Sequence, residues 1–128
     1  MDRTVVAQAP IILVIDDDSA IRNSLRFLLE IEGFQVRLYP TAHDLLAEED
    51  TPSFGCLVID YKLPDMNGLE LIASLRRRDV TLPAILITTN PPAPVRERAA
   101  LAGVPVVEKP LLNETLMHGI RAALIRDK

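Results

Sequence analysis

Three carboxylates follow directly on an apolar run near the start of the chain. Residues 11–15 are all apolar, and Asp16, Asp17 and Asp18 come next. Two carboxylates about 4 Å apart repel each other by roughly 4 kcal/mol at an effective dielectric constant near 20. Such crowding persists only where something offsets the repulsion, and a hard divalent cation with oxygen ligands does so. Mg²⁺ fits best, because it keeps several waters and takes only one or two carboxylates.

Further polar residues stand where later apolar runs end. Asp60 follows the run CLVI, Thr88 follows AILI, and Lys109 comes shortly after VPVV. In open parallel sheets, ligands bind beyond the carboxyl ends of the strands. If these runs are parallel strands, three carboxylates, a hydroxyl and an amine meet in one crevice. Each residue alone has an ordinary explanation, such as a helix cap for Asp18, but their convergence favours a site.

The elements that would position these residues alternate along the chain. Apolar runs predict strands over 11–15, 34–39, 56–59, 84–87 and 104–107. Helical spacing predicts helices over 21–33, 41–50, 68–78, 93–103 and 113–126. This alternation predicts an α/β fold, a doubly wound, five-stranded parallel sheet with helices on both faces. The second strand is less continuously apolar, which favours a place near the sheet edge.

Composition limits the classes of function. The 128 residues predict one domain, with a short arm over 1–9 and the domain over 10–128. The net charge of −4 disfavours nucleic acid as a direct partner. The single cysteine, Cys56, rules out a disulfide framework and favours a buried, inert thiol. No apolar stretch is long enough to span a bilayer, so no membrane partner and a cytoplasmic location are expected.

Four segments carry a resemblance to a known family. VIDDDS, LVIDYKLPDMNGLEL, ILITT and VVEKP together resemble the receiver domain of two-component response regulators, nearest to receivers of the FixJ type. The resemblance covers about residues 10–126. It implies a flavodoxin-like (CheY-like) fold of five βα units with strand order 2-1-3-4-5.

The resemblance also implies a role for each polar residue. Asp60 would accept a phosphoryl group from a sensor histidine kinase or a phosphotransfer protein. The residues that would hold Mg²⁺ are Asp16, Asp17, Asp60 and, through its backbone carbonyl, Lys62. Thr88 and Lys109 would contact the phosphoryl group, and the Lys109–Pro110 bond would be cis. Such a domain catalyses its own phosphotransfer and dephosphorylation, and it is not a turnover enzyme on an external substrate.

One position departs from the family pattern. The family has an aromatic residue three positions before the lysine, where this chain has Val106. That ring turns inward when the threonine hydroxyl moves toward the phosphate, and a β-branched valine cannot make this movement. We therefore expect intact phosphorylation chemistry with an atypical output switch. The alternative is a pseudo-receiver, an interaction module that works without phosphorylation.

The expected output is protein–protein contact with a downstream protein that the sequence does not identify, because the chain ends within the last helix of this fold. The fourth helix, fifth strand and fifth helix form the candidate surface for a homodimer. Two other classes fit less well. A phosphatase of the haloacid dehalogenase type would need an aspartate where this chain has Lys62. A flavodoxin-like nucleotide binder would need a Gly, Ser or Thr-rich loop where this chain has Asp16 to Asp18.

Overall fold

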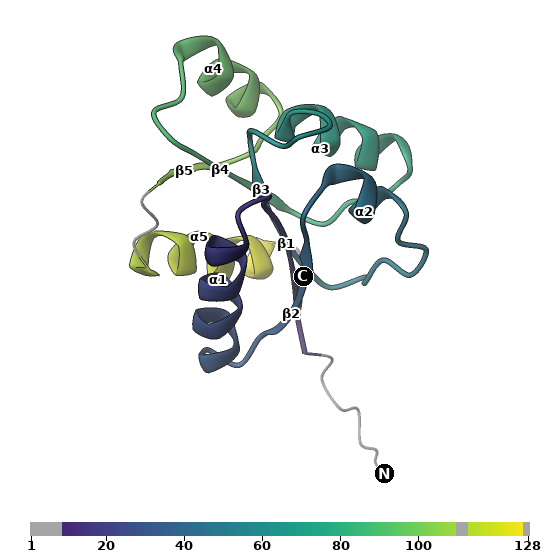
Figure 1. Cartoon of the computed structure of the whole chain (residues 1–128), viewed down its shortest axis with the longest axis vertical. Helices are drawn as coiled ribbons and strands as arrows, with labels where there is room; N and C mark the ends of the chain where they lie inside the picture. The colour runs from purple at the N-terminus through teal and green to yellow at the C-terminus, as the bar shows by residue number, and fades with distance from the viewer. Residues whose placement is uncertain (1–8, 110–112, 127–128) are drawn as a thin grey trace.

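Strands and helices alternate throughout the chain (Figure 1). The computed structural model describes residues 9–109 and 113–126. The strands are β1 (Ile11–Ile15), β2 (Gln35–Tyr39), β3 (Gly55–Asp60), β4 (Ala84–Thr88) and β5 (Val106–Glu108). The helices are α1 (Ser19–Ile31), α2 (Ala42–Leu46), α3 (Gly68–Arg77), α4 (Ala93–Leu101) and α5 (Asn113–Arg126).

The strands form one parallel sheet in the order β2-β1-β3-β4-β5. This confirms the predicted doubly wound α/β class and the predicted strand order. β1, β3 and β4 have a strand on either side and are almost completely buried, which explains their continuous apolar runs. β2 lies at an edge and is mostly half-buried, as its weaker pattern predicts.

Helices cover both faces of the sheet, with α1 and α5 on one face and α2, α3 and α4 on the other (Figure 1). Successive residues of each strand point to opposite faces, so the core divides into two clusters. In β1, Leu13 and Ile15 pack toward α2, α3 and α4, whereas Ile12 and Val14 pack toward α1 and α5. Cys56 is fully buried in the second cluster, as predicted.

Several elements differ from the predicted bounds, and the differences in β5 and α2 have a clear physical cause. β5 begins at Val106 instead of residue 104, because Pro105 before it has no N–H to donate to a ladder. α2 ends at Leu46 instead of residue 50. Beyond its end, the Glu48 carboxylate accepts hydrogen bonds from the Tyr39 hydroxyl, at 2.7 Å, and from Arg37, at 3.1 Å. After Leu46 the chain therefore leaves the helix, and Glu48 binds side chains of β2 instead.

Some expectations fall on other parts of the chain. Residues 1–8, most of the predicted arm, lie outside the described residues, and so does Pro110, on which the predicted cis bond depends. Within the described residues, no helix combines the length and apolar content that crossing a bilayer requires.

Candidate functional site

The residues singled out from the sequence lie at one edge of the sheet. Asp16 follows β1 directly, Asp60 ends β3, Thr88 ends β4, and Lys109 follows β5. Because parallel strands all end at the same edge, these positions are neighbours across the sheet. Asp60 and Thr88 are the last residues of their strands, so both strands run one residue further than predicted.

Asp16, Asp17 and Asp60 form an acidic cluster in which one oxygen from each carboxylate lies within 4.8 Å of the others. Asp16 is fully buried and Asp60 nearly so, whereas Asp17 is exposed. Oδ1 of Asp16 accepts a hydrogen bond from the Asp18 amide at 2.9 Å. Its Oδ2 is buried without a hydrogen bond. Buried polar atoms are nearly always satisfied, so this oxygen without a hydrogen bond, in a carboxylate close to two others, fits a cation ligand.

Lys109 supplies the positive charge next to this cluster, and we call the cluster together with Lys109 the acidic pocket. Its Nζ lies 3.2 Å from Oδ2 of Asp16 and 3.2 Å from Oδ2 of Asp60, and it hydrogen-bonds the latter. The contact with Asp16 is an ion pair without hydrogen-bond geometry. Burial alone would lower the pKa of the Lys109 ammonium, but the charges of Asp60 and Asp16 outweigh burial and raise the pKa. Lys109 is therefore held in its charged form.

For Asp60, the effects of the surroundings on the pKa favour the uncharged form of the side chain. Burial raises the pKa of its carboxyl, and the charge of Asp16 raises it further. The charge and hydrogen bond of Lys109 and the backbone N–H of Lys62 act in the other direction without cancelling the rise. The negative charge on Asp60 is thus under-compensated by the protein alone, which leaves room for a cation or an electrophile.

The loop after β3 holds Asp60 in position through backbone contacts. The Lys62 amide approaches Asp60 Oδ1 at 3.4 Å, and the Gly68 amide donates to the Tyr61 carbonyl at 2.7 Å. A Cβ on Gly68 would lie 2.7 Å from the Asp60 carbonyl oxygen, so only glycine fits against this strand end. Asn67 then starts α3 through a capping box with Glu70.

The first turn of α1 fixes Asp16. Asp18 is the N-cap of α1, and its side chain accepts from the amides of Ala20 and Ile21, which confirms its predicted role. Arg22, one turn further, donates to the Asp16 carbonyl at 2.7 Å. Sequence reasoning missed Arg22, although its place four residues after the cap puts it on the side of α1 that faces the site.

A contact between His43 and Asp65 was also missed. Asp65, in the loop between β3 and α3, accepts from the backbone amides of Ala42 at 3.2 Å and His43 at 2.8 Å, and it contacts the His43 ring. It thereby ties this loop to the start of α2. His43 is otherwise an exposed helix residue, as is His118.

Val106 and α4 belong to the part of the fold that was predicted to carry the output switch. Val106 is half-buried and packs against the same core cluster as Val95 and Ala99 of α4. α4 begins after Asn90, whose φ is 45°, and it has no side-chain cap at its start. Two arginines connect α4 to the neighbours of site residues. Arg96 pairs with Glu108, next to Lys109, and Arg98 approaches the Tyr61 hydroxyl, next to Asp60, at 3.5 Å.

Sequence comparisons place this pocket among known proteins. A family model described as "Response regulator receiver domain" matches residues 12–121. The transcriptional regulatory protein FixJ of Bradyrhizobium diazoefficiens is 36% identical over 114 residues, which cover 88% of this chain and 56% of that protein. The transcriptional regulatory protein TdiR of Thauera aromatica is 30% identical over 125 residues, 97% of this chain and 55% of that protein. The chain thus spans about half the length of these curated relatives.

Solved structures share the fold. A CheY-like response regulator receiver domain protein from Methanospirillum hungatei superposes with a TM-score of 0.85 at 29% identity, covering 94% of this chain and 97% of that one. Full-length FixJ from B. japonicum superposes with a TM-score of 0.85 at 33% identity, covering 93% of this chain and 59% of that one. The range matched by the family model includes the whole acidic pocket, from Asp16 to Lys109.

Proposed function

The chain belongs to the response regulator receiver domain family, and from this we propose that Asp60 accepts a phosphoryl group in a Mg²⁺-dependent reaction. Receiver domains are signalling modules that interact with histidine kinases or phosphotransfer proteins and do not turn over an external substrate. The donor that we propose here is a phosphohistidine on such a protein. The Asp60 carboxylate would form the new bond to phosphorus as the phosphorus–nitrogen bond of the donor breaks.

The observation that carries this proposal is the position of Lys109 between two carboxylates. Its Nζ is 3.2 Å from both Asp16 and Asp60 and lies at the pocket where those strands end. Phosphoryl transfer needs little covalent help from a protein, but it does need in-line positioning and neutralisation of the phosphoryl charge. We propose that Lys109 pairs with the transferred group on Asp60 while it stays paired with Asp16.

The metal ligands that we propose are Asp16, Asp17, Asp60 and the backbone carbonyl of Lys62. The unsatisfied Oδ2 of Asp16 and the close carboxylates support this set. Mg²⁺, when bound, would neutralise the acidic cluster and the phosphoryl oxygens. Thr88, buried at the end of β4, is the residue that we propose as hydrogen-bond donor to the phosphoryl group.

Incubation with Mg²⁺ and acetyl phosphate, followed by intact-mass measurement, tests the proposal. We expect one added phosphate on the unchanged chain and on Asp18→Asn, since asparagine also caps helices well, and none on Asp60→Asn. Beryllofluoride binding, followed by NMR, covers the case of a short-lived adduct. No adduct together with no beryllofluoride binding would contradict the proposal.

We propose further that the output switch is atypical. Val106 packs against the core below α4 and has no ring that could turn inward. The phosphorylated state would then be signalled by a shift of the loop after Thr88, or by a partner that contacts the phosphorylated pocket directly. NMR shifts between free and beryllofluoride-bound protein should concentrate in the loops after β3 and β4. A rearrangement of α4 and β5 would contradict this part of the proposal.

Val106 also favours a second candidate function, a pseudo-receiver that binds a partner without phosphorylation. Under this alternative, Asp60→Asn would leave partner binding unchanged. Under the leading proposal, the same substitution would remove the difference between the unphosphorylated and phosphorylated states. A pull-down with the unchanged chain, with and without acetyl phosphate, beside Asp60→Asn, separates the two.

The remaining parts of the proposal concern context. We propose residues 10–128 as the receiver domain, residues 1–9 as an arm, a cytoplasmic location, and output through an unidentified downstream protein without direct binding to nucleic acid.

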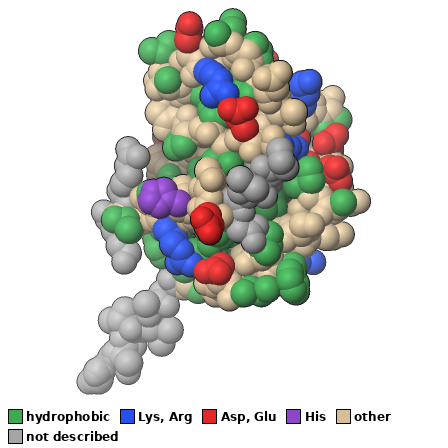
Figure 2. Space-filling model, turned by 90° about the vertical axis from the view of Figure 1, so that its left-hand side faces the viewer, with side chains coloured by type: hydrophobic (Ala, Val, Ile, Leu, Met, Phe, Trp, Pro, Cys, Tyr) green, Lys and Arg blue, Asp and Glu red, His purple; other side chains and the backbone are tan. Residues whose placement is uncertain are grey.

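A homodimer through α4, β5 and α5 is the candidate assembly. Figure 2 shows this side of the molecule, where basic and acidic side chains lie next to one another, and Arg96 pairs there with Glu108. Light scattering with and without beryllofluoride tests for dimerisation, which Arg96→Glu should weaken.

A further inference from the structure

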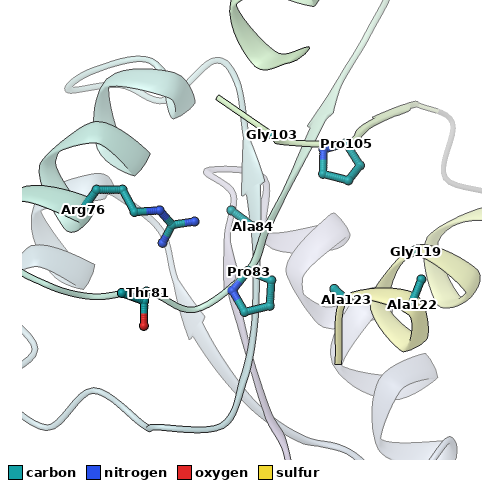
Figure 3. Close-up of a pocket in the computed structure, with 9 residues that line it drawn as sticks. All are labelled: Arg76, Thr81, Pro83, Ala84, Gly103, Pro105, Gly119, Ala122 and Ala123. Atoms are coloured by element: carbon teal, nitrogen blue, oxygen red, sulfur yellow. The ribbon is translucent and has the colours of Figure 1, made fainter. Parts of the chain in front are cut away.

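A cavity of about 300 Å³ opens at the edge of the sheet opposite the acidic pocket (Figure 3). Its walls come from the last turn of α3, the starts of β4 and β5, and one side of α5. Ligand pockets in proteins usually measure about 300–1,000 Å³, so this cavity can hold a small organic molecule. Neither Asp60 nor its neighbours take part in it.

The cavity exists because the ladder between β4 and β5 stops early. Their register begins with Leu86 opposite Val106, and the Leu86 amide donates to the Pro105 carbonyl at 2.9 Å. The next bond toward the amino-terminal edge would need an N–H at position 105 to reach the Ala84 carbonyl, and proline has none. On its β5 side, Ala84 therefore borders the cavity instead of pairing with a residue of β5, although it still pairs with Leu57 of β3.

Small residues of α5 form the opposite wall. Gly119, Ala122 and Ala123 line the cavity from this helix. A Cβ on Gly119 would lie 3.3 Å from Cδ1 of Ile85, so the helix approaches β4 closely at that point. One turn further, the short alanine side chains leave the space open, and Pro83 faces them from the loop before β4 (Figure 3). These side chains make this wall of the cavity apolar.

Arg76 brings a positive charge to this cavity. Figure 3 shows its guanidinium extending from α3 toward Pro83 and Ala84. Its Nη1 donates to the carbonyls of Val80, at 2.9 Å, and Leu82, at 2.8 Å, which fixes the group in place. In the described part of the chain, no carboxylate forms a salt bridge with Arg76.

The guanidinium keeps unused binding capacity. It has five N–H donors, and only those on Nη1 have partners among the described residues. Partial burial lowers the pKa of Arg76, as expected of a cation that has lost hydration without gaining an anion. Its planar fork matches the two oxygens of a carboxylate. Thr81 also lines the cavity, and its hydroxyl points away from the Arg76 guanidinium in Figure 3.

We propose that this cavity binds a small organic carboxylate. The carboxylate pairs with Arg76, and the apolar body lies between Pro83, Pro105 and Ala122. The volume of about 300 Å³ corresponds to roughly ten liquid waters, which limits the body to a single ring or a short chain. This site is separate from the phosphorylation chemistry proposed above and does not depend on it.

The test is an NMR titration of the metal-free chain with cyclohexanecarboxylate, with its neutral amide as the matched probe. For a ligand of this size we expect a Kd near 1 mM. The largest amide shifts should fall at Thr81, Ala84, Gly103 and Gly119. The neutral amide should bind at least 10-fold more weakly. Equal binding of both probes, or no saturable shift up to about 20 mM, would overturn the proposal.

Three variants locate the binding. Arg76→Gln should weaken cyclohexanecarboxylate at least 10-fold, while Arg77→Gln, which removes a neighbouring arginine outside the cavity, should leave its Kd unchanged. Because Arg76 also holds two carbonyls of its own loop, Ala122→Leu provides a second, independent test. It fills the hollow, keeps the cation and should abolish saturable binding. A separate groove lies between α3 and α4, lined by residues that include Ile72, Arg98 and Leu101. Unchanged binding by Ala122→Leu, or shifts centred on Leu101 in that groove, would overturn the proposal.

Discussion

The Lys109 ammonium lies 3.2 Å from Oδ2 of Asp60 across 49 residues of sequence. The same nitrogen lies 3.2 Å from Asp16, so one cation serves two buried carboxylates. Two negative charges against one positive charge leave the pocket acidic. Burial raises the pKa of Asp60, and the charge of Asp16 raises it further. The excess of negative charge sets the conditions under which the pocket takes up a cation.

Lys109→Met should slow phosphorylation. The substitution keeps most of the side-chain length but removes the charge that would neutralise the phosphoryl group on Asp60. We expect a loss of roughly 100-fold in the rate with acetyl phosphate, which is the usual cost of one lost electrostatic contact to a reacting group. Intact mass over time measures this rate. Lys62→Met is the control, because the proposed metal ligand there is the backbone carbonyl. A similar loss in both variants would contradict a special role for the Lys109 ammonium.

Asp60→Asn should stabilise the metal-free protein in a pH-dependent way. An unfolded aspartate titrates near pH 3.9, and the folded pKa of Asp60 is higher. Between these values the folded state binds more protons, so stability falls as pH rises through that window. The variant should therefore exceed the unchanged chain in stability most clearly above the folded pKa, with the gap closing as pH falls. Urea unfolding in chelator, at a series of pH values, measures the gap. A constant or reversed gap would show that ionised Asp60 is not under strain.

Mg²⁺ should stabilise the chain through Asp17. A ligand at 100 times its Kd stabilises the folded state by about 2.7 kcal/mol, and a chelator should reverse the effect. Asp17 is exposed, so Asp17→Asn should fold normally but require at least 10-fold more Mg²⁺ for the same rise in Tm. Asp18→Asn lies next to it and should respond like the unchanged chain. An equal response of Asp17→Asn would remove Asp17 from the ligand set.

Gly68→Ala should damage both the fold and the site. The new Cβ would meet the Asp60 carbonyl oxygen at 2.7 Å and Cδ1 of Leu86 at 2.8 Å. Overpacking of this kind costs roughly 1–3 kcal/mol, and relief would displace the end of β3. Urea unfolding and the acetyl phosphate rate should therefore both change. Gly33→Ala is the matched control, because Gly33 has a φ of 93° but nothing within 4 Å of the added Cβ. Gly33→Ala should lower stability while leaving the rate intact.

Much of the fold could be predicted from the sequence, because a parallel sheet covered on both faces produces apolar runs with little ambiguity. The bounds were less predictable where polar residues belong to strands. Asp60 and Thr88 end β3 and β4, although their side chains are the kind that usually marks a loop. Pro105 delayed β5 through a missing N–H, an effect that hydrophobicity does not record.

The candidate site was predictable to the extent that it depends on strand ends. The meeting of Asp16, Asp60 and Lys109 follows from parallel topology, and the structure places them together. The contact of Asp65 with His43 was not predictable, because it joins a loop to the start of α2, 22 residues away, and no local pattern specifies their relative position. The chemical roles assigned by resemblance stay predictions.

The acidic pocket forms only in a correctly folded chain. Asp16, Asp60 and Lys109 come from the ends of three different strands, and the strand that carries Asp60 lies between β1 and β4 in the sheet. A chain with β1, β3 or β5 misplaced would bring together at most two of the three. Since non-local pairing of this kind forms slowly compared with helices, the pocket is complete only once β1, β3, β4 and β5 have paired. Chains that have not finished folding would therefore not be phosphorylated by a phosphodonor. The amount of phosphorylated protein would then report only natively folded molecules.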